Sequence, residues 1–540
     1  MVNPQKLTNY YKTMKKLFQN SSLNLALLGL ATMPAVAQKT ETKQTRPNVL
    51  FIAVDDLKPL IAAYGDKMAI TPGMDRLANE GMAFQNCYVQ QAISGATRAS
   101  CLTGMRPDKT KVWDLITNFR QVNTNAVSLP EYFIKNGYET AAVGKIYHVG
   151  SAGPGHDAAS WSTPWINDKA ETYVNFVPEK GKKGPAVECA DVPDNTYQDG
   201  VCAEIGIKLL NQLKDNGKPF FLAVGFHKPH LPFVAPKKYW DLYKRDQFKI
   251  APFQHKAAGS PDLAYHVSGE LKSYTDIPQF DSYSEQELDH LSVDKQKELI
   301  HGYYAATSYM DAQLVKVLNE LDRLKLSDNT IVILWGDHGW HLGDHGLWNK
   351  HTDFEQATHA CMLMRVKGMK PGIKPLTQCE FVDIFPTLCE LSGIPTPKYL
   401  DGISLIPAMK NPTAELREFA FSQYPRKDAM GYTIRTKRFR YTEWIGDLYS
   451  AEFPYSQAKI VATEMYDYDK DPLETKSLIG DKAYSKEEVM MKKMFTEAMN
   501  REHVQYANYS KLADWHEPIS TTPEKKGKKI KKDRKSGDVE

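Results

Sequence analysis

The stretch RPNVLFIAVDDL, from Arg46 to Leu57, decides the fold class of this 540-residue chain. Its apolar residues run without a polar break and include several β-branched types, which is typical of a parallel β-strand buried on both faces. The run stops abruptly at two carboxylates, Asp55 and Asp56. The stretch therefore predicts an interior strand whose carboxyl end carries polar groups.

Three later stretches repeat this design of an apolar run followed by charged or imidazole side chains. They are NGYETAAVGKIYH (Asn136–His148), PFFLAVGFHKPHLPF (Pro219–Phe233) and NTIVILWGDHGWHLGDHGLWNK (Asn329–Lys350). Helical patterns lie between them, such as the apolar stripe of Met310, Leu314, Leu318 and Leu321. Strands that alternate with helices predict an α/β fold, in which ligands gather beyond the carboxyl ends of the strands.

The pattern of apolar and polar residues differs between the two parts of the chain that meet at about residue 411. We expect a catalytic domain over 46–410, built as a large, mixed, mainly parallel sheet between helices. Short alternating strands, as in FAFSQYP (Phe419–Pro425) and MGYTIRTKRFRYTEW (Met430–Trp444), predict a small antiparallel sheet with a helix beside it over 411–520. The Lys-rich tail 524–540 predicts a disordered, solubilising segment.

The amino-terminal residues 1–37 have the features of a secretory signal peptide. Three lysines between positions 12 and 16 precede a short apolar stretch, which ends in an Ala-x-Ala cleavage signal at 35–37. Met1 and Met14 both fit as the start of translation. Because the apolar stretch is too short to span a bilayer stably, we expect an exported protein, periplasmic or secreted, with no transmembrane segment.

Charge and cysteine content limit the partners and the covalent links of the chain. The net charge is +3, and the tail 524–540 alone carries eight Lys/Arg against four Asp/Glu, so the remainder has no basic excess and we expect no nucleic-acid partner. The seven cysteines include Cys189 and Cys202, which bracket a short polar loop. These two either form a disulfide in an oxidising compartment or remain thiols.

Polar residues at two of the predicted strand ends form a candidate cation site. Asp55 and Asp56 follow the first strand, and Asp337 and His338 follow the last. Three carboxylates and one imidazole are too rich in oxygen for a typical structural zinc site, and flexible oxygen coordination favours Ca²⁺ over Mg²⁺. The sequence therefore predicts one Ca²⁺ per chain at this edge of the sheet.

A second group of residues favours the binding of a doubly charged anion. QQAISGATRASCLTG (Gln90–Gly104) places Ser94 and Arg98 about one turn apart at the start of a predicted helix. Lys145 and Lys350 follow two of the strands. Two lysines, an arginine and a cation around one serine suit the transfer of a sulfuryl or phosphoryl group.

Several of these motifs together resemble the type I formylglycine-dependent sulfatases. Ser94-Gly95-Ala96-Thr97-Arg98, followed by Leu102-Thr103-Gly104, is similar to the signature of that family, in which a Cys or Ser is oxidised to formylglycine; here Ala96 replaces the commoner Pro and Thr97 the commoner Ser. Further stretches resemble the iduronate 2-sulfatase-like bacterial polysaccharide sulfatases of the family: NVLFIAVDDL, VGKIYH, AVGFHKPHLPF, DHGWHLGDHGLWNKH, GYTIRTKRFRYTEW and DYDKDPLE.

The resemblance implies an alkaline-phosphatase-like fold and a role for each site residue. Ser94 would be converted to formylglycine by a maturation enzyme of the radical S-adenosylmethionine type. The cation would be held by Asp55, Asp56, Asp337, His338 and the modified Ser94. Arg98 would hold residue 94 and sulfate, and Lys145 and Lys350 would bind sulfate oxygens. His148 would hydrogen-bond the aldehyde hydrate, and His230 would protonate the leaving alcohol. His227 is a weaker candidate, for a supporting or substrate contact.

The implied function is that of an exo-acting carbohydrate sulfatase. Its substrate would be a uronate-containing sulfated polysaccharide or oligosaccharide, such as ulvan or a glycosaminoglycan. Two alternatives stand beside it. One is an alkaline-phosphatase-type phosphoesterase, which would use an unmodified Ser94 and two zinc ions. The other is a non-catalytic protein that binds sulfated glycans and never converts Ser94.

Overall fold

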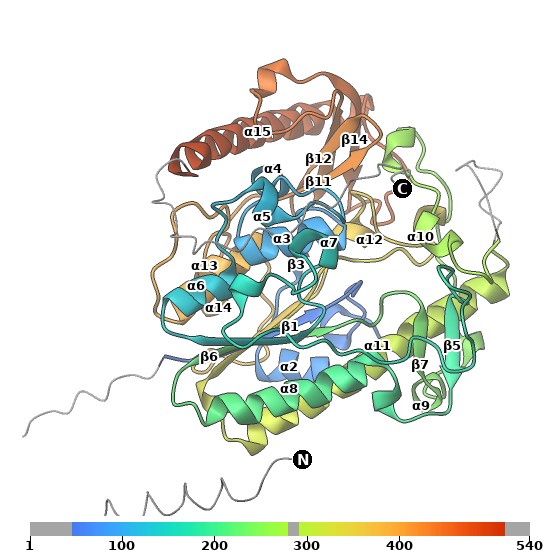
Figure 1. Cartoon of the computed structure of the whole chain (residues 1–540). Helices are drawn as coiled ribbons and strands as arrows, with labels where there is room; N and C mark the ends of the chain where they lie inside the picture. The colour runs from blue at the N-terminus through green and yellow to red at the C-terminus, as the bar shows by residue number, and fades with distance from the viewer. Residues whose placement is uncertain (1–45, 279–290, 514–540) are drawn as a thin grey trace, which may run out of the picture. The chain divides into compact units, whose positions relative to one another are not determined.

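A six-stranded sheet lies at the centre of the computed structural model, which describes residues 46–278 and 291–513 (Figure 1). The strands in spatial order are β2 (Met82–Ala83), β9 (Met362–Arg365), β8 (Thr330–Gly336), β1 (Asn48–Val54), β6 (Phe220–Phe226) and β4 (Glu139–Gly144). β8, β1, β6 and β4 are parallel, whereas β9 and β2 are antiparallel additions at one edge. The predicted α/β fold with a mixed, mainly parallel sheet is confirmed.

β1 occupies the interior of this sheet and ends level with both neighbours. Val54 lies opposite Phe226 of β6 and Gly336 of β8. The ladder continues one residue further on each side, because the Asp55 N–H donates to the Phe226 carbonyl at 3.2 Å and the Asp337 N–H donates to the Val54 carbonyl at 3.0 Å. The polar residues after β1 and β8 are therefore held side by side by backbone hydrogen bonds.

Helices cover both faces of the sheet, as α/β folds require. On one face lie α2 (Pro72–Glu80), α8 (Gln198–Lys214) and α11 (Val293–Arg323), and on the other lie α3 (Ser94–Thr103), α6 (Leu129–Lys135) and α13 (Ile384–Leu391) (Figure 1). Alternate residues of β1 enter the two cores, Leu50 on the α8 side and Phe51 on the α3 side. The predicted stripe of α11, from Met310 to Leu321, is fully buried.

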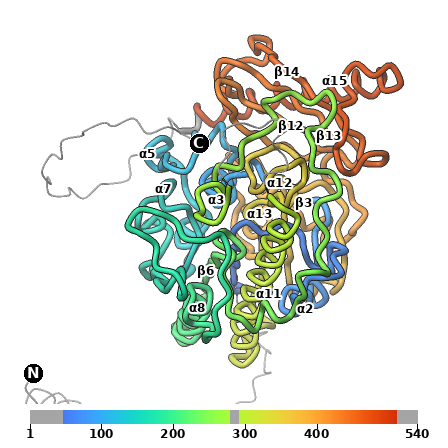
Figure 2. The backbone as a smooth tube through the Cα atoms, turned by 90° about the vertical axis from the view of Figure 1, so that its right-hand side faces the viewer, coloured from blue at the N-terminus to red at the C-terminus, as the bar shows by residue number. Residues whose placement is uncertain are grey.

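The carboxyl-terminal segment forms the predicted small antiparallel sheet with its helix. Its elements are β11 (Ala420–Arg426), β12 (Ala429–Arg435), β13 (Phe439–Ile445), β14 (Ile460–Asp467) and α15 (Ser485–Ala513). Figure 2 shows them at one end of the molecule, on the side of α3 rather than of α8. The Ser422 hydroxyl donates to the Val89 carbonyl at 2.6 Å, and the Gln423 N–H donates to the Gln90 carbonyl at 2.8 Å. This sheet is thus hydrogen-bonded to the segment that leads into α3.

The disulfide alternative is not realised. All seven cysteines, which lie within the described residues, are unpaired. Cys189 is exposed on β5 (Val187–Ala190), whereas Cys202 is buried in α8 and its thiol donates to the Gly225 carbonyl at 3.4 Å. A bridge would have to bring a surface residue and a core residue together.

The two terminal predictions, the signal peptide at 1–37 and the Lys-rich tail at 524–540, lie outside the described residues. Within 46–278 and 291–513, no helix is both long and apolar enough to cross a membrane.

Candidate active site

Four of the predicted site residues meet where β1 and β8 end. The Asp56 N–H donates to Asp337 Oδ1 at 2.9 Å, and His338 Nε2 lies 3.4 Å from Asp56 Oδ1. Asp55 completes the set, and all four side chains are buried. They converge because adjacent parallel strands deliver their carboxyl ends to the same edge of the sheet.

Ser94 joins this set from the first residue of α3. Its hydroxyl oxygen lies 3.2 Å from Asp55 Oδ1 and 3.2 Å from His338 Nε2. The helix is docked by the Thr97 hydroxyl, which donates to the Asp337 carbonyl at 2.8 Å. Gly95 allows the approach, since a Cβ there would lie 2.1 Å from the Asp114 carbonyl oxygen.

Arg98 lies one turn further along α3 and holds the acidic set together. Its Nε donates to Asp337 Oδ2 at 2.9 Å, and its Nη2 donates to Asp55 Oδ1 at 3.1 Å. Its Nη1 donates to the backbone carbonyls of Lys145 and Ile146. Burial lowers the pKa of Arg98, but the charges of Asp337 and Asp55 outweigh burial and the pKa is raised.

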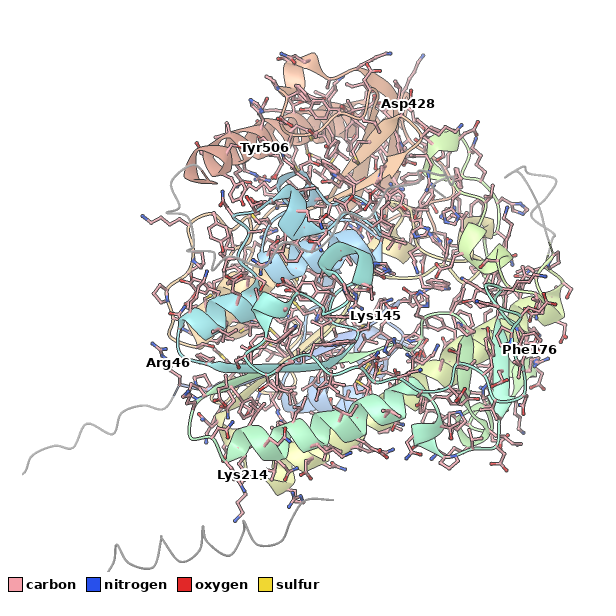
Figure 3. The ribbon with its side chains drawn as sticks, viewed as in Figure 1. Arg46, Lys145, Phe176, Lys214, Asp428 and Tyr506 are labelled. Carbon is pink, nitrogen blue, oxygen red and sulfur yellow. The ribbon has the colours of Figure 1, made fainter. Side chains whose placement is uncertain are left out.

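Two lysines bring further positive charge to the same place. Lys145, labelled in Figure 3, follows β4, and its ammonium forms an ion pair with Asp55. Lys350 Nζ lies 3.0 Å from Asp56 Oδ2. Burial acts to raise the pKa of Asp55, yet the charges of Lys145, His230 and Arg98 hold it well below its usual range.

The donor set fits a divalent cation. Asp55, Asp56 and His230, and likewise Asp56, Asp337 and His338, offer ligand atoms that lie within 4.8 Å of one another. Burial raises the pKa of Asp56 to about 7 despite the charges of His230 and Lys350. The positive charges around Asp56 do not fully offset the cost of burying its ionised carboxylate, so a bound cation would stabilise the ionised form. Carboxylate oxygens are the ligands that Ca²⁺ prefers.

His230 faces the acidic set from the loop after β6. Its Nδ1 lies 2.6 Å from the Leu231 carbonyl oxygen and, because a carbonyl only accepts, carries a hydrogen. Its Nε2 lies 3.9 Å from Asp56 Oδ2 and 3.1 Å from Glu270 Oε1. The ring is therefore fixed with Nε2 toward the site.

His148 caps the short helix α7 (Val149–Ala152), where its Nδ1 accepts from the Gly150 N–H at 3.3 Å. Burial, followed by the charge of Lys145, lowers the pKa of His148 to about 4. The neutral ring therefore carries its hydrogen on Nε2.

His227 supports the loop instead of joining the acidic set. Its Nε2 lies 2.9 Å from Asp168 Oδ2, and its backbone N–H donates to Asp199 Oδ1 at 2.7 Å. The neighbouring Lys228 ammonium donates to the His230 carbonyl at 2.9 Å. These bonds fix the backbone that carries His230.

Sequence reasoning missed Glu270, which lies in α10 (Gly269–Lys272). Its Oε2 is 2.8 Å from Lys350 Nζ, so one carboxylate joins Lys350 to His230. The surrounding stretch, about 255–287, carries no recognisable motif, and an isolated Glu gives no signal of its own. Only the fold places it beside the site.

An acidic cation site next to a hydroxyl group, with lysines around it, suits cleavage of an ester of a tetrahedral oxyanion. A phosphonate monoester hydrolase of Agrobacterium radiobacter has a similar fold, with a TM-score of 0.68 at 20% identity over 85% of this chain and 96% of its own. Fold and site together define a protein with a large, mainly parallel sheet, whose strand ends carry an acidic cation site beside a hydroxyl group.

The chain belongs to the sulfatase family. The sulfatase family model matches residues 47–394, and a model described as N-sulphoglucosamine sulphohydrolase, C-terminal, matches 343–501. Iduronate 2-sulfatase of Homo sapiens is 33% identical over 531 residues, which cover 85% of this chain and 96% of the relative. The expected class of enzyme, a sulfuric ester hydrolase, is confirmed.

One further relative and one solved structure are also similar to this chain. Delta 4,5-hexuronate-2-O-sulfatase of Bacteroides thetaiotaomicron is 26% identical, covering 85% of this chain and 89% of its own. A solved protein in complex with its substrate D-glucosamine-2-N,6-O-disulfate aligns with a TM-score of 0.68 at 22% identity, covering 86% of this chain and 99% of its own.

Proposed function

We propose that this sulfatase removes an ester sulfate from a terminal uronate of a sulfated glycan, using a formylglycine made from Ser94. The observation that carries the proposal is the position of the Ser94 hydroxyl, 3.2 Å from both Asp55 and His338 in the candidate cation site. Similarity to enzymes named for iduronate and hexuronate 2-sulfates supports the choice of sugar.

The cation would be held by Asp55, Asp56, Asp337, His338 and residue 94. When bound, Ca²⁺ supplies a Lewis acid that polarises a sulfuryl oxygen. A formylglycine hydrate at position 94 would supply two hydroxyls on one carbon, one as the nucleophile toward sulfur and one whose loss of a proton would let sulfate leave and restore the aldehyde. A plain serine has no second hydroxyl.

The other side chains bind, orient and move protons. Lys145 and Lys350 receive the sulfate oxygens, and Arg98 fixes the two carboxylates that it bridges. His230 acts as the acid in its doubly protonated form: its Nδ1–H is committed to the Leu231 carbonyl, and the hydrogen on Nε2 passes to the leaving sugar oxygen. His148, neutral and next to Lys145, hydrogen-bonds the hydroxyls of residue 94.

Mass spectrometry of the peptide that contains Ser94 tests the maturation step. Conversion to formylglycine lowers the peptide mass by two hydrogen atoms, and we expect this only when a radical S-adenosylmethionine maturation enzyme is present. An unmodified Ser94 in an active enzyme, with two zinc ions per chain, would instead support the phosphoesterase alternative. Unmodified Ser94 with glycan binding and no turnover would support the non-catalytic one.

Defined sulfated oligosaccharides test the substrate. We expect sulfate release from the terminal 2-O-sulfated uronate of glycosaminoglycan-type fragments, identified by NMR of the desulfated product. Release from a sulfated rhamnose beside a uronate in ulvan-type fragments would favour that alternative target. Release from chain interiors while the terminal residue keeps its sulfate would contradict the exo assignment. Export is tested by fractionation, which should place the mature protein in the periplasm or the medium.

A further inference from the structure

Lys183 lies in a loop that is fixed against the segment after α10. The Thr275 N–H donates to the Gly184 carbonyl at 3.0 Å, and the Ala186 N–H donates to Asp276 Oδ1 at 2.7 Å. The Lys183 ammonium lies 4.4 Å from the centre of the Tyr274 ring. One backbone bond, one bond from a backbone N–H to a carboxylate and a cation–π contact thus determine where this side chain sits.

Tyr274 places Lys183 next to the active site. The chain continues as turns after α10, since the Ser273 N–H donates to the Glu270 carbonyl at 3.4 Å and the Tyr274 N–H to the Leu271 carbonyl at 3.1 Å. These turns keep Tyr274 beside α10, where burial raises the pKa of the Tyr274 hydroxyl and the charge of Glu270 raises it further. Glu270 in turn contacts His230 and Lys350.

Lys183 differs from the cations of the site in having no acidic partner. Arg98, Lys145 and Lys350 all form ion pairs with carboxylates of the site. Lys183 is exposed, and within 46–278 and 291–513 no Asp or Glu forms an ion pair with it. Although the residue is exposed to solvent, partial burial of its ammonium group lowers the pKa of Lys183, the charge of Glu270 raises it and that of Lys350 lowers it, in keeping with a position near both.

We propose that Lys183 is a specificity-determining residue that binds a second anionic group of the substrate, the carboxylate of the uronate that carries the ester sulfate. The inference rests on the proposed function, in which sulfate and carboxylate belong to one sugar ring. When Lys145 and Lys350 bind the sulfate, the carboxylate of the same sugar needs another cation, and Lys183 is a lysine beside the site. A Lys on a flexible stem, resting on an aromatic ring, suits such a charge-assisted contact.

A pair of substrates and three variants test the inference. The substrates are a 2-O-sulfated uronate disaccharide and its carboxyl-reduced counterpart, which keeps the sulfate. Lys183→Met preserves the apolar stem and removes the charge. We expect it to lower kcat/KM on the uronate roughly tenfold, mainly through KM, since loss of one charge-assisted contact is worth about one power of ten. On the reduced substrate we expect no change.

Two further variants serve as matched controls. Lys183→Arg keeps the charge and should retain most of the activity on the uronate. Lys182 is the neighbouring lysine, 67% exposed at its side chain and paired with Glu179 at 2.7 Å, so Lys182→Met should behave as wild type on both substrates. Thermal melting of each variant checks that the fold is intact.

The outcomes separate this inference from the proposed function. Lys183 does not bind the carboxylate if wild type desulfates both substrates with equal kcat/KM, or if Lys183→Met lowers kcat/KM equally on both. Either result would leave the proposed sulfatase activity supported. If wild type desulfates neither, the uronate assignment fails and the role of Lys183 falls with it. A loss confined to the uronate supports both.

Discussion

At the scale of single residues, the site consists of buried charges that depend on one another. Arg98 has no exposed surface and forms ion pairs with Asp337 at 2.9 Å and Asp55 at 3.1 Å. Removing one partner of such a group leaves an uncompensated buried charge, which costs far more than the loss of an exposed pair. The same residues therefore determine stability and the geometry of catalysis.

Arg98→Ala should destabilise the protein and abolish turnover. We expect a loss of about 3–5 kcal/mol in the free energy of unfolding, because Asp55 and Asp337 lose their shared cation. Arg76 is the control, because its side chain is 28% exposed and pairs with Glu80 at 2.8 Å and Asp322 at 2.5 Å, and Arg76→Ala should cost about 1 kcal/mol. Urea denaturation measures both, and equal losses would contradict the assigned role of Arg98.

Ser94→Ala should abolish sulfate release, since no hydroxyl or aldehyde remains at the centre of the site. Ser94→Cys should be active only when made in a host that matures cysteine. The measurements are sulfate release and the mass of the peptide containing residue 94. Turnover by Ser94→Ala would show that the nucleophile lies elsewhere.

His230→Ala should separate two kinds of leaving group. A sugar alkoxide needs a proton when it leaves, and loss of a general acid typically costs 10²- to 10⁴-fold. A phenolate leaves without one, so aryl sulfates should lose much less rate. Comparing kcat on a sugar sulfate and on an aryl sulfate tests this, and equal losses on both would reject His230 as the acid.

At the scale of elements, the site is a junction of strand ends with the start of one helix. β1 and β8 end in register, and α3 meets them through the bond from Thr97 to the Asp337 carbonyl. The close approach of α3 to the chain at Asp114 depends on the missing side chain of Gly95. A small shift of α3 would move Ser94 and Arg98 together.

Gly95→Ala should therefore impair activity beyond its effect on stability. The added Cβ would lie 2.1 Å from the Asp114 carbonyl oxygen, so backbone must move, and overpacking of this kind typically costs about 1–3 kcal/mol. Gly155→Ala is the control, because its nearest neighbour, the Ala158 Cβ, is 4.0 Å away. Thermal melting and sulfate release are measured for both. Wild-type activity in Gly95→Ala would show that the position of α3 is not critical.

At the scale of the whole molecule, buried charges join the carboxyl-terminal helix α15 to the segments around α3. Arg106 lies 2.7 Å from Glu380, the last residue of β10 (Gln378–Glu380), and 3.1 Å from Glu502 of α15. β11 is bonded to the segment before α3. The carboxyl-terminal elements therefore brace the helix that carries Ser94.

Removal of the cation should lower the stability of the whole molecule. A ligand that binds only the folded state at a hundred times its Kd stabilises it by about 2.7 kcal/mol. We expect a chelator to lower Tm and abolish turnover, Ca²⁺ to restore both, and Mg²⁺ to restore less, since Mg²⁺ demands tighter octahedral geometry. Metal analysis should find one Ca²⁺ per chain; an unchanged Tm after chelation would contradict the site.

The sequence by itself determined the strands, the helix start and the chemistry at their ends. Continuous apolar runs form buried strands, as β1 and β8 show, and the polar residues that follow them must lie at the edge of the sheet. The family resemblance added the link between Ser94 and Arg98. These are local signals, carried by residues close together in the chain.

Only the tertiary structure decided which distant residues meet. Glu270 reaches Lys350 and His230, and Lys183 rests on Tyr274, because irregular segments are packed there by hydrogen bonds to other parts of the chain. Cys189 and Cys202 stay apart because one faces the surface and the other the core. Such contacts have no periodicity and no motif, since long-range packing, not local preference, creates them.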